Sequence, residues 1–194
     1  MKRKKVMLAL LLVVVVAVAG YFMMIPDVRN RPLSTREFML RNPDFGDTVA
    51  LFELRRGHYE FNLYYYHFGE RVVVEPLNSA IVIDRTEMVG FYTHMTEDKN
   101  INFGMRTTGW HADTIFILEL GEYSAQSWRP VSDYIRNLRV GEEQALMTYQ
   151  FDTSSIMRIM SVVDFSEFGE QIEDFRESEH IVIITITRVE LDVT

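Results

Sequence analysis

The chain has 194 residues, with 20 basic and 28 acidic side chains, a formal net charge of −8 and no cysteine. An acidic chain repels phosphate backbones, which excludes nucleic acid as the expected partner. The lack of cysteine excludes disulfide bonds, thiolate metal ligands and a cysteine nucleophile, so stability must come from an ordinary core, for which 47% hydrophobic residues suffice.

The first predicted element is an apolar helix. A basic tail, residues 1–5, precedes an uncharged run over residues 6–25. Twenty residues rising about 1.5 Å each span about 30 Å, the thickness of the hydrocarbon core of a bilayer. This length favours a retained single-pass anchor in the cell membrane, with a cytoplasmic N-terminus and an extracytoplasmic domain. The alternative is a cleaved signal segment, with Ala17-Val18-Ala19 before a cut at Gly20, which would give a secreted protein.

The next segment, residues 26–47, is predicted to be a juxtamembrane stalk. It contains Ser34-x-x-Glu37, a possible capping box that predicts one short helix. The remainder, residues 48–194, is predicted to be one β-rich domain, because β-branched and aromatic runs alternate with polar turns. Its first three runs predict two consecutive hairpins, with turns at Arg55-Arg56-Gly57 and Gly69-Glu70. Four further runs predict a meander.

Short helices are expected in the second half of the domain. The segment 130–141 has apolar residues at helical spacing and a terminal glycine. Asp164-x-x-Glu167 predicts the start of another helix, which carries Phe165 and Phe168. The last run, "HIVIITITRVELDV", is apolar on both faces and predicts a central, covered strand.

The expected fold class is therefore mainly β: an antiparallel sandwich or barrel with a few short helices in its second half. The alternative is an α+β fold, in which helices cover a single antiparallel sheet.

The segment "HYEFNLYYYHF" carries the first candidate binding residues. Tyr64 and Tyr66 share one face of the predicted strand, where they would offer an aromatic platform to a glycan or a protein partner. Together with Trp110 and His111 they form the candidate binding surface. The favoured interpretation is structural, because aromatic residues are common in strands and a helix could cover both rings.

Metal and catalytic chemistry have little support in the sequence. His111-x-Asp113 would project two ligands from one face of a strand, with His94 or His67 as a third. No third ligand stands at a diagnostic spacing, and no nucleophile or phosphate-binding motif occurs. We therefore predict no catalytic residue, no metal and no cofactor.

Three functions remain as hypotheses. The leading one is a membrane-anchored extracytoplasmic domain that binds or scaffolds another envelope component, a protein or a glycan, without catalytic activity of its own. The second is a carrier of small apolar ligands, whose order of elements resembles lipocalin-like barrels only in outline. The glycine–tryptophan signature of those barrels is expected on the first strand, whereas Gly109-Trp110 lies in the middle of this chain. The third is a hydrolase or metal-dependent enzyme that uses His111 and Asp113. The oligomeric state stays open.

Overall fold

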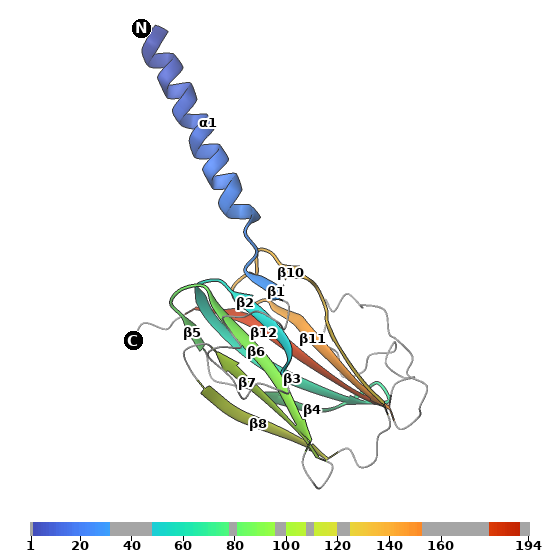
Figure 1. Ribbon diagram of the computed structural model, residues 1–194. Coiled ribbons are helices and arrows are strands. Elements are labelled where there is room, and N and C mark those ends of the chain that lie inside the picture. The colour runs from blue at the N-terminus through green and yellow to red at the C-terminus, as the bar shows by residue number, and fades with distance from the viewer. Residues whose placement is uncertain are drawn as a thin grey trace.

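In the part of the chain that it describes, the computed structural model contains two antiparallel β-sheets and one helix (Figure 1). The structure describes residues 2–31, 48–77, 81–95, 100–107, 111–119, 125–152 and 179–190. The mainly β class and the antiparallel pairing predicted from the sequence are confirmed. The alternative of a single sheet covered by helices is wrong, because the strands form two six-stranded sheets. Within the described ranges the one helix is α1 (Lys2–Met24), and it projects away from both sheets.

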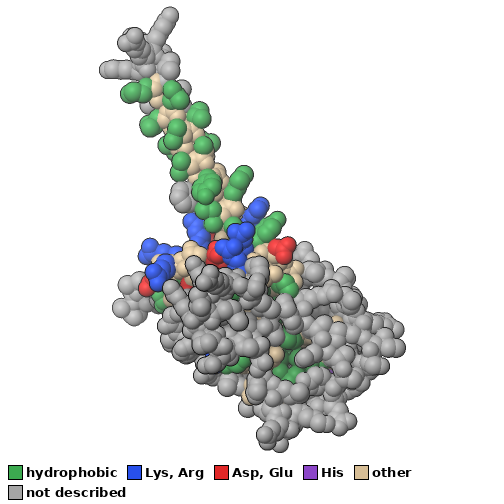
Figure 2. All heavy atoms as spheres, in the orientation of Figure 1, with side chains coloured by type: hydrophobic (Ala, Val, Ile, Leu, Met, Phe, Trp, Pro, Cys, Tyr) green, Lys and Arg blue, Asp and Glu red, His purple; other side chains and the backbone are tan. Residues whose placement is uncertain are grey.

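The helix α1 projects away from the sheets, and its apolar side chains are exposed. Met7 is 72% exposed and Met24 is 71% exposed. Figure 2 shows hydrophobic side chains on the coloured part of the helix. Counting only the positions whose side chains the structure describes, no helix is long and apolar enough to cross a membrane.

The first sheet, sheet A, has six strands in the order β10-β1-β2-β6-β7-β8. Their bounds are β1 Val28–Arg31, β2 Thr48–Leu54, β6 Glu87–Met95, β7 Asn100–Thr107, β8 His111–Glu119 and β10 Tyr134–Ile135. The strand β1 lies within the segment predicted as a stalk, and it pairs with both β2 and β10. The β-rich part of the chain therefore begins at Val28.

The second sheet, sheet B, has the order β4-β3-β12-β11-β9, and β5 pairs with the first half of β3. Its strands are β3 Gly57–His67, β4 Glu70–Pro76, β5 Ile81–Ile83, β9 Ala125–Pro130, β11 Glu143–Asp152 and β12 His180–Val189. The predicted central position of the last strand is confirmed, because β12 pairs with β3 on one side and β11 on the other. Residues 180–186 are all buried.

Only one of the two predicted hairpins forms. The strands β3 and β4 are joined by Phe68 and Gly69, whose φ angles of 47° and 82° suit a tight two-residue turn. The prediction that β2 and β3 pair is wrong, since they belong to different sheets. Both strands bury aromatic side chains in the same core, so the short connection at Arg55 and Arg56 crosses from one layer to the other.

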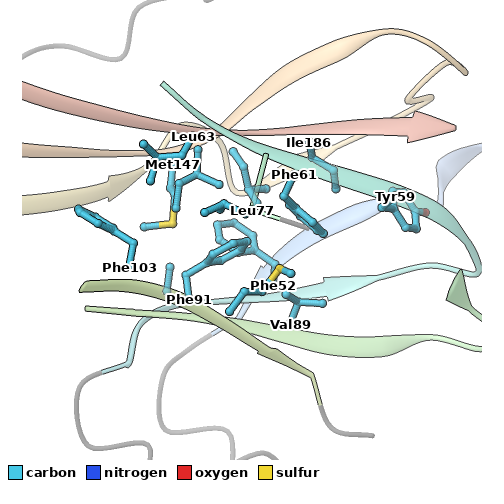
Figure 3. Packing of buried hydrophobic residues seen from close by; sticks show 14 of the residues in the cluster. Phe52, Tyr59, Phe61, Leu63, Leu77, Val89, Phe91, Phe103, Met147 and Ile186 are labelled. Atoms are coloured by element: carbon cyan, nitrogen blue, oxygen red, sulfur yellow. The ribbon is translucent and has the colours of Figure 1, made fainter. Parts of the chain in front are cut away.

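The core lies between the two sheets and is rich in aromatic rings (Figure 3). Phe91 of sheet A meets Phe61 of sheet B edge-on, with ring centroids 5.5 Å apart. Phe103 and Tyr149 make a second such contact across the layers, at 5.4 Å. Each buried ring stabilises the fold by about 1.5–3 kcal/mol through loss of apolar surface to water. The two layers therefore share one hydrophobic core.

The helix predicted over residues 130–141 is wrong. Residues 134 and 135 form β10, where Ile135 pairs with Val28. The Ser132 hydroxyl donates to the backbone oxygen of Tyr134 at 2.8 Å, and Asn137 has a φ of 56°, outside the helical region. Pairing with β1 gives these backbone groups partners that a helix would have supplied internally. The helices predicted at Ser34–Glu37 and Asp164–Glu167 lie outside the described residues.

Candidate functional site

The predicted aromatic platform is buried. Tyr64 is 8% exposed and Tyr66 is 0% exposed. Because Tyr65 faces the main core, its two neighbours project from the opposite face of sheet B, where they form a second apolar cluster. This cluster also contains Ala145, Ile181 and Ile183. Neither ring offers the exposed face that a binding platform requires.

The Tyr64 hydroxyl belongs to a polar cluster around Glu143. It donates to the two carboxylate oxygens at 3.0 and 2.8 Å, while Asn62 Nδ2 donates to one of them at 3.1 Å and Thr185 Oγ1 also donates. Burial first, and the hydrogen bond to Glu143 second, raise the pKa of Tyr64 above its usual range. Donor side chains on β3 and β12 thus satisfy the carboxylate on β11, so this cluster holds neighbouring strands of sheet B together. Sequence reasoning missed it because the partners are far apart in the chain.

The other predicted site residues are only partly described. Trp110 lies outside the described residues. His111 is the first residue of β8, at the edge of sheet A, but its side chain and that of Asp113 are not described. Of the two suggested third ligands, His94 belongs to β6 but its side chain is not described, and His67 belongs to β3 of sheet B. The proposed grouping of these side chains therefore stays a prediction.

His67 instead joins a group of three possible metal ligands with His180 and Glu179. Each offers one ligand atom, and these atoms all lie within 4.8 Å of one another. His67 ends β3 and His180 begins β12, and the two are direct cross-strand partners. Their rings stack with centroids 5.0 Å apart and planes 13° apart. Sequence reasoning missed the group because only the register of β3 against β12 brings the residues together.

Each ring nitrogen of the buried His180 also faces a polar side chain. Its Nδ1 lies 2.7 Å from the Tyr65 hydroxyl, and its Nε2 lies 3.6 Å from Glu179 Oε1. The backbone oxygen of Glu179 also accepts a 3.0 Å hydrogen bond from the amide of Phe68, in the turn after β3. Two imidazoles and a carboxylate form a donor set typical of zinc and similar divalent ions.

The opposite end of the domain, where α1 leaves it, is organised around Asp27. Its buried carboxylate accepts a 2.9 Å hydrogen bond from the amide of Leu138, and Arg188 Nη1 lies 3.8 Å away. Its backbone bonds to Ile135 and Arg55. These contacts attach Asp27, three residues after the end of α1, to β10, β12 and the loop after β2.

Exposed arginines surround this attachment. Figure 2 shows basic side chains gathered where α1 meets the domain, with a few acidic ones among them. The exposed arginines next to the Asp27 contacts in the chain are Arg29, Arg56, Arg136 and Arg139. Arg31, the last residue of β1, is paired with Glu53 instead.

Comparison of the chain with models of protein families, with curated proteins and with solved structures finds no match.

Proposed function

We propose that the protein is a binding or scaffolding module held at a membrane by α1, with its β-rich domain on the extracytoplasmic side. The observation that carries this proposal is the exposure of apolar side chains along a helix that stands clear of the domain. Apolar surface of this extent is unfavourable in water and calls for an apolar environment. The uncharged run over residues 6–25 has the length that a bilayer demands.

The end of the domain next to α1 supports the same arrangement. Arg29, Arg56, Arg136 and Arg139 would face lipid headgroups if α1 lay in the bilayer, where guanidinium groups can form charge-assisted hydrogen bonds with headgroup phosphates. The contacts of Asp27 would keep the domain close to the headgroups. The basic residues 2–5 favour a cytoplasmic location for the other end of α1.

The binding role is favoured over transport of a small ligand. The space between the sheets is occupied by packed rings such as Phe61 and Phe91. Edge strand β4 exposes Val72 and Val74, and the adjacent turn exposes Phe68. Exposed apolar side chains on an edge strand suit contact with a second polypeptide.

Membrane fractionation tests the anchor. The full chain should stay in the carbonate-washed membrane pellet with its N-terminal peptide intact. Leu12→Asp combined with Val15→Asp should release it, because an acidic residue at the centre of a spanning helix costs about 3 kcal/mol. The matched control combines Val72→Asp with Val140→Asp, which changes two exposed apolar residues of the domain and should leave the chain in the pellet.

Two outcomes would contradict the anchor. A mature soluble form that begins at Gly20 would show that the segment is a signal peptide. Equal release of the wild type and both double variants would show that α1 does not lie in lipid. Protease added to intact spheroplasts should digest the domain, and protection until lysis would overturn the extracytoplasmic location.

A further inference from the structure

We propose that His67, His180 and Glu179 form a binding site for one divalent transition-metal ion of the zinc class, at the end of sheet B far from α1. The pairing of β3 with β12 runs from His58↔Val189 to His67↔His180. Nine residues at about 3.4 Å each place the three ligands about 30 Å from the end of the sheet where α1 is attached. The proposal does not depend on the membrane anchor.

The sheet itself brings the ligands together. Tyr65 and His67 continue the core-facing row of β3, and His180 begins the core-facing row of β12. Both imidazoles therefore project from the same face, at the end of the layer. Ligand atoms on a tetrahedral zinc lie roughly 3.3 Å apart, given zinc–nitrogen bonds of about 2.0–2.1 Å. The observed separations within 4.8 Å require only side-chain rotations, chiefly of the exposed His67.

Tyr65 supplies an independent argument for a ligand role of His180. A histidine that binds a metal through one ring nitrogen usually donates its other N–H to an oxygen, which fixes the orientation of the ring. The Tyr65 hydroxyl lies 2.7 Å from Nδ1 of His180, and a hydroxyl can accept such a hydrogen bond. The remaining nitrogen, Nε2, is the one that faces Glu179. Tyr65 is thus a positioning residue.

The donor set selects the class of ion. Two neutral imidazoles and one carboxylate suit zinc, cobalt or nickel, whereas calcium and magnesium prefer all-oxygen sites. Three protein ligands leave a fourth position for water or for a ligand atom from elsewhere. The bound ion would join β3 to β12, two strands from distant parts of the sequence, and would therefore stabilise the folded state.

Zinc titration of the full chain in detergent tests the proposal. The protein is prepared without a histidine tag and stripped with a chelator. Calorimetry should show one zinc ion bound per chain, and zinc should raise the melting temperature while magnesium does not. His67→Ala removes an exposed ligand without disturbing the core, and it should abolish both effects. His58→Ala, on the same strand at the far end, is the matched control and should bind zinc like the wild type.

Tyr65→Phe separates positioning from ligation. The variant should still bind zinc, with affinity lowered about 10- to 100-fold, as expected for loss of a hydrogen-bond partner of a ligating histidine. The visible absorption of bound cobalt should also change in this variant and not in His58→Ala. The proposal is wrong if the wild type shows neither heat of binding nor a melting shift at about 1 mM zinc. It is equally wrong if His67→Ala retains wild-type zinc affinity.

Discussion

The carboxylate of Asp27 accepts a 2.9 Å hydrogen bond from the backbone amide of Leu138, 111 residues further along the chain. The same carboxylate lies 3.8 Å from Arg188 Nη1. One side chain thus contacts a loop and the last described strand at the point where α1 ends. These contacts hold the start of the β-rich part of the chain against β12 and the loop after β10.

Asp27→Ala should lower the free energy of unfolding by about 1–3 kcal/mol, because the buried amide of Leu138 loses its acceptor. Asp27→Asn keeps an oxygen at this position and should cost less. Urea unfolding of the full chain in mild detergent measures both. Asp133→Ala changes an exposed acid near the same loop and should stay within about 0.5 kcal/mol of the wild type. Equal effects at the two positions would contradict the role given to Asp27.

Tyr66→Ala should destabilise the domain by about 3–5 kcal/mol, as expected when a large buried ring is removed from a packed cluster. Tyr134→Ala removes an exposed ring of the same size and serves as the control, with a cost under about 1 kcal/mol. Chemical denaturation gives both values. Near-wild-type stability of Tyr66→Ala together with loss of partner binding would show instead that this face is a binding platform.

The side chains of Tyr64 and Glu143 should be energetically coupled. A double-mutant cycle with Tyr64→Phe and Glu143→Gln should give a coupling energy of about 0.5–3 kcal/mol, since their hydrogen bonds are partly buried. Glu142 and Gln144 form a comparable side-chain hydrogen bond of 2.9 Å on the surface. Their cycle, measured by the same urea titration, should give less than about 0.5 kcal/mol. Similar coupling in the two pairs would argue against a stabilising role of the Glu143 cluster.

The stability of the domain should fall steeply in alkaline solution. Burial raises the pKa of several tyrosine hydroxyls above the usual value of 10.0, namely those of Tyr59, Tyr64, Tyr65, Tyr66 and Tyr149. The folded state therefore holds these protons more tightly than the unfolded state. The protonated hydroxyls contribute fully to the free energy of unfolding below about pH 10. This contribution is lost as the pH rises towards the folded-state pKa values, at about 1.4 kcal/mol per pH unit and per hydroxyl.

Urea midpoints measured between about pH 9 and pH 11 check this dependence. The variant Tyr66→Phe removes one of the buried hydroxyls and should show a shallower decline than the wild type. A midpoint that is constant over this range would contradict the burial of the five hydroxyls.

Local patterns in the sequence predicted individual strands well. The long runs that became β3, β11 and β12 have enough β-branched and aromatic residues to be recognised without their partners. The central position of β12 followed from its lack of a polar face. These features depend on residues that are close together in the chain.

Features that depend on contacts between distant segments of the chain could not be predicted in this way. The turn at Arg55-Arg56-Gly57 serves a hairpin and a crossing between layers equally well, and only the shared core decides between them. The apolar spacing in residues 130–141 fits a helix, but pairing of Ile135 with Val28 satisfies the backbone differently. The His67–His180 pair likewise depends on a register that no local pattern reveals.

The central place of β12 in sheet B also governs the order in which the chain can fold during synthesis. The strand β3 is made early, but its long-range partner β12 emerges from the ribosome more than one hundred residues later. Until then β4 and β5 pair with β3, and the backbone groups of β3 that face β12 lack their partners. Pairings between distant segments form slowly and leave such strands open to aggregation. A nascent chain of this protein would therefore benefit from a chaperone that shields β3 until β12 arrives.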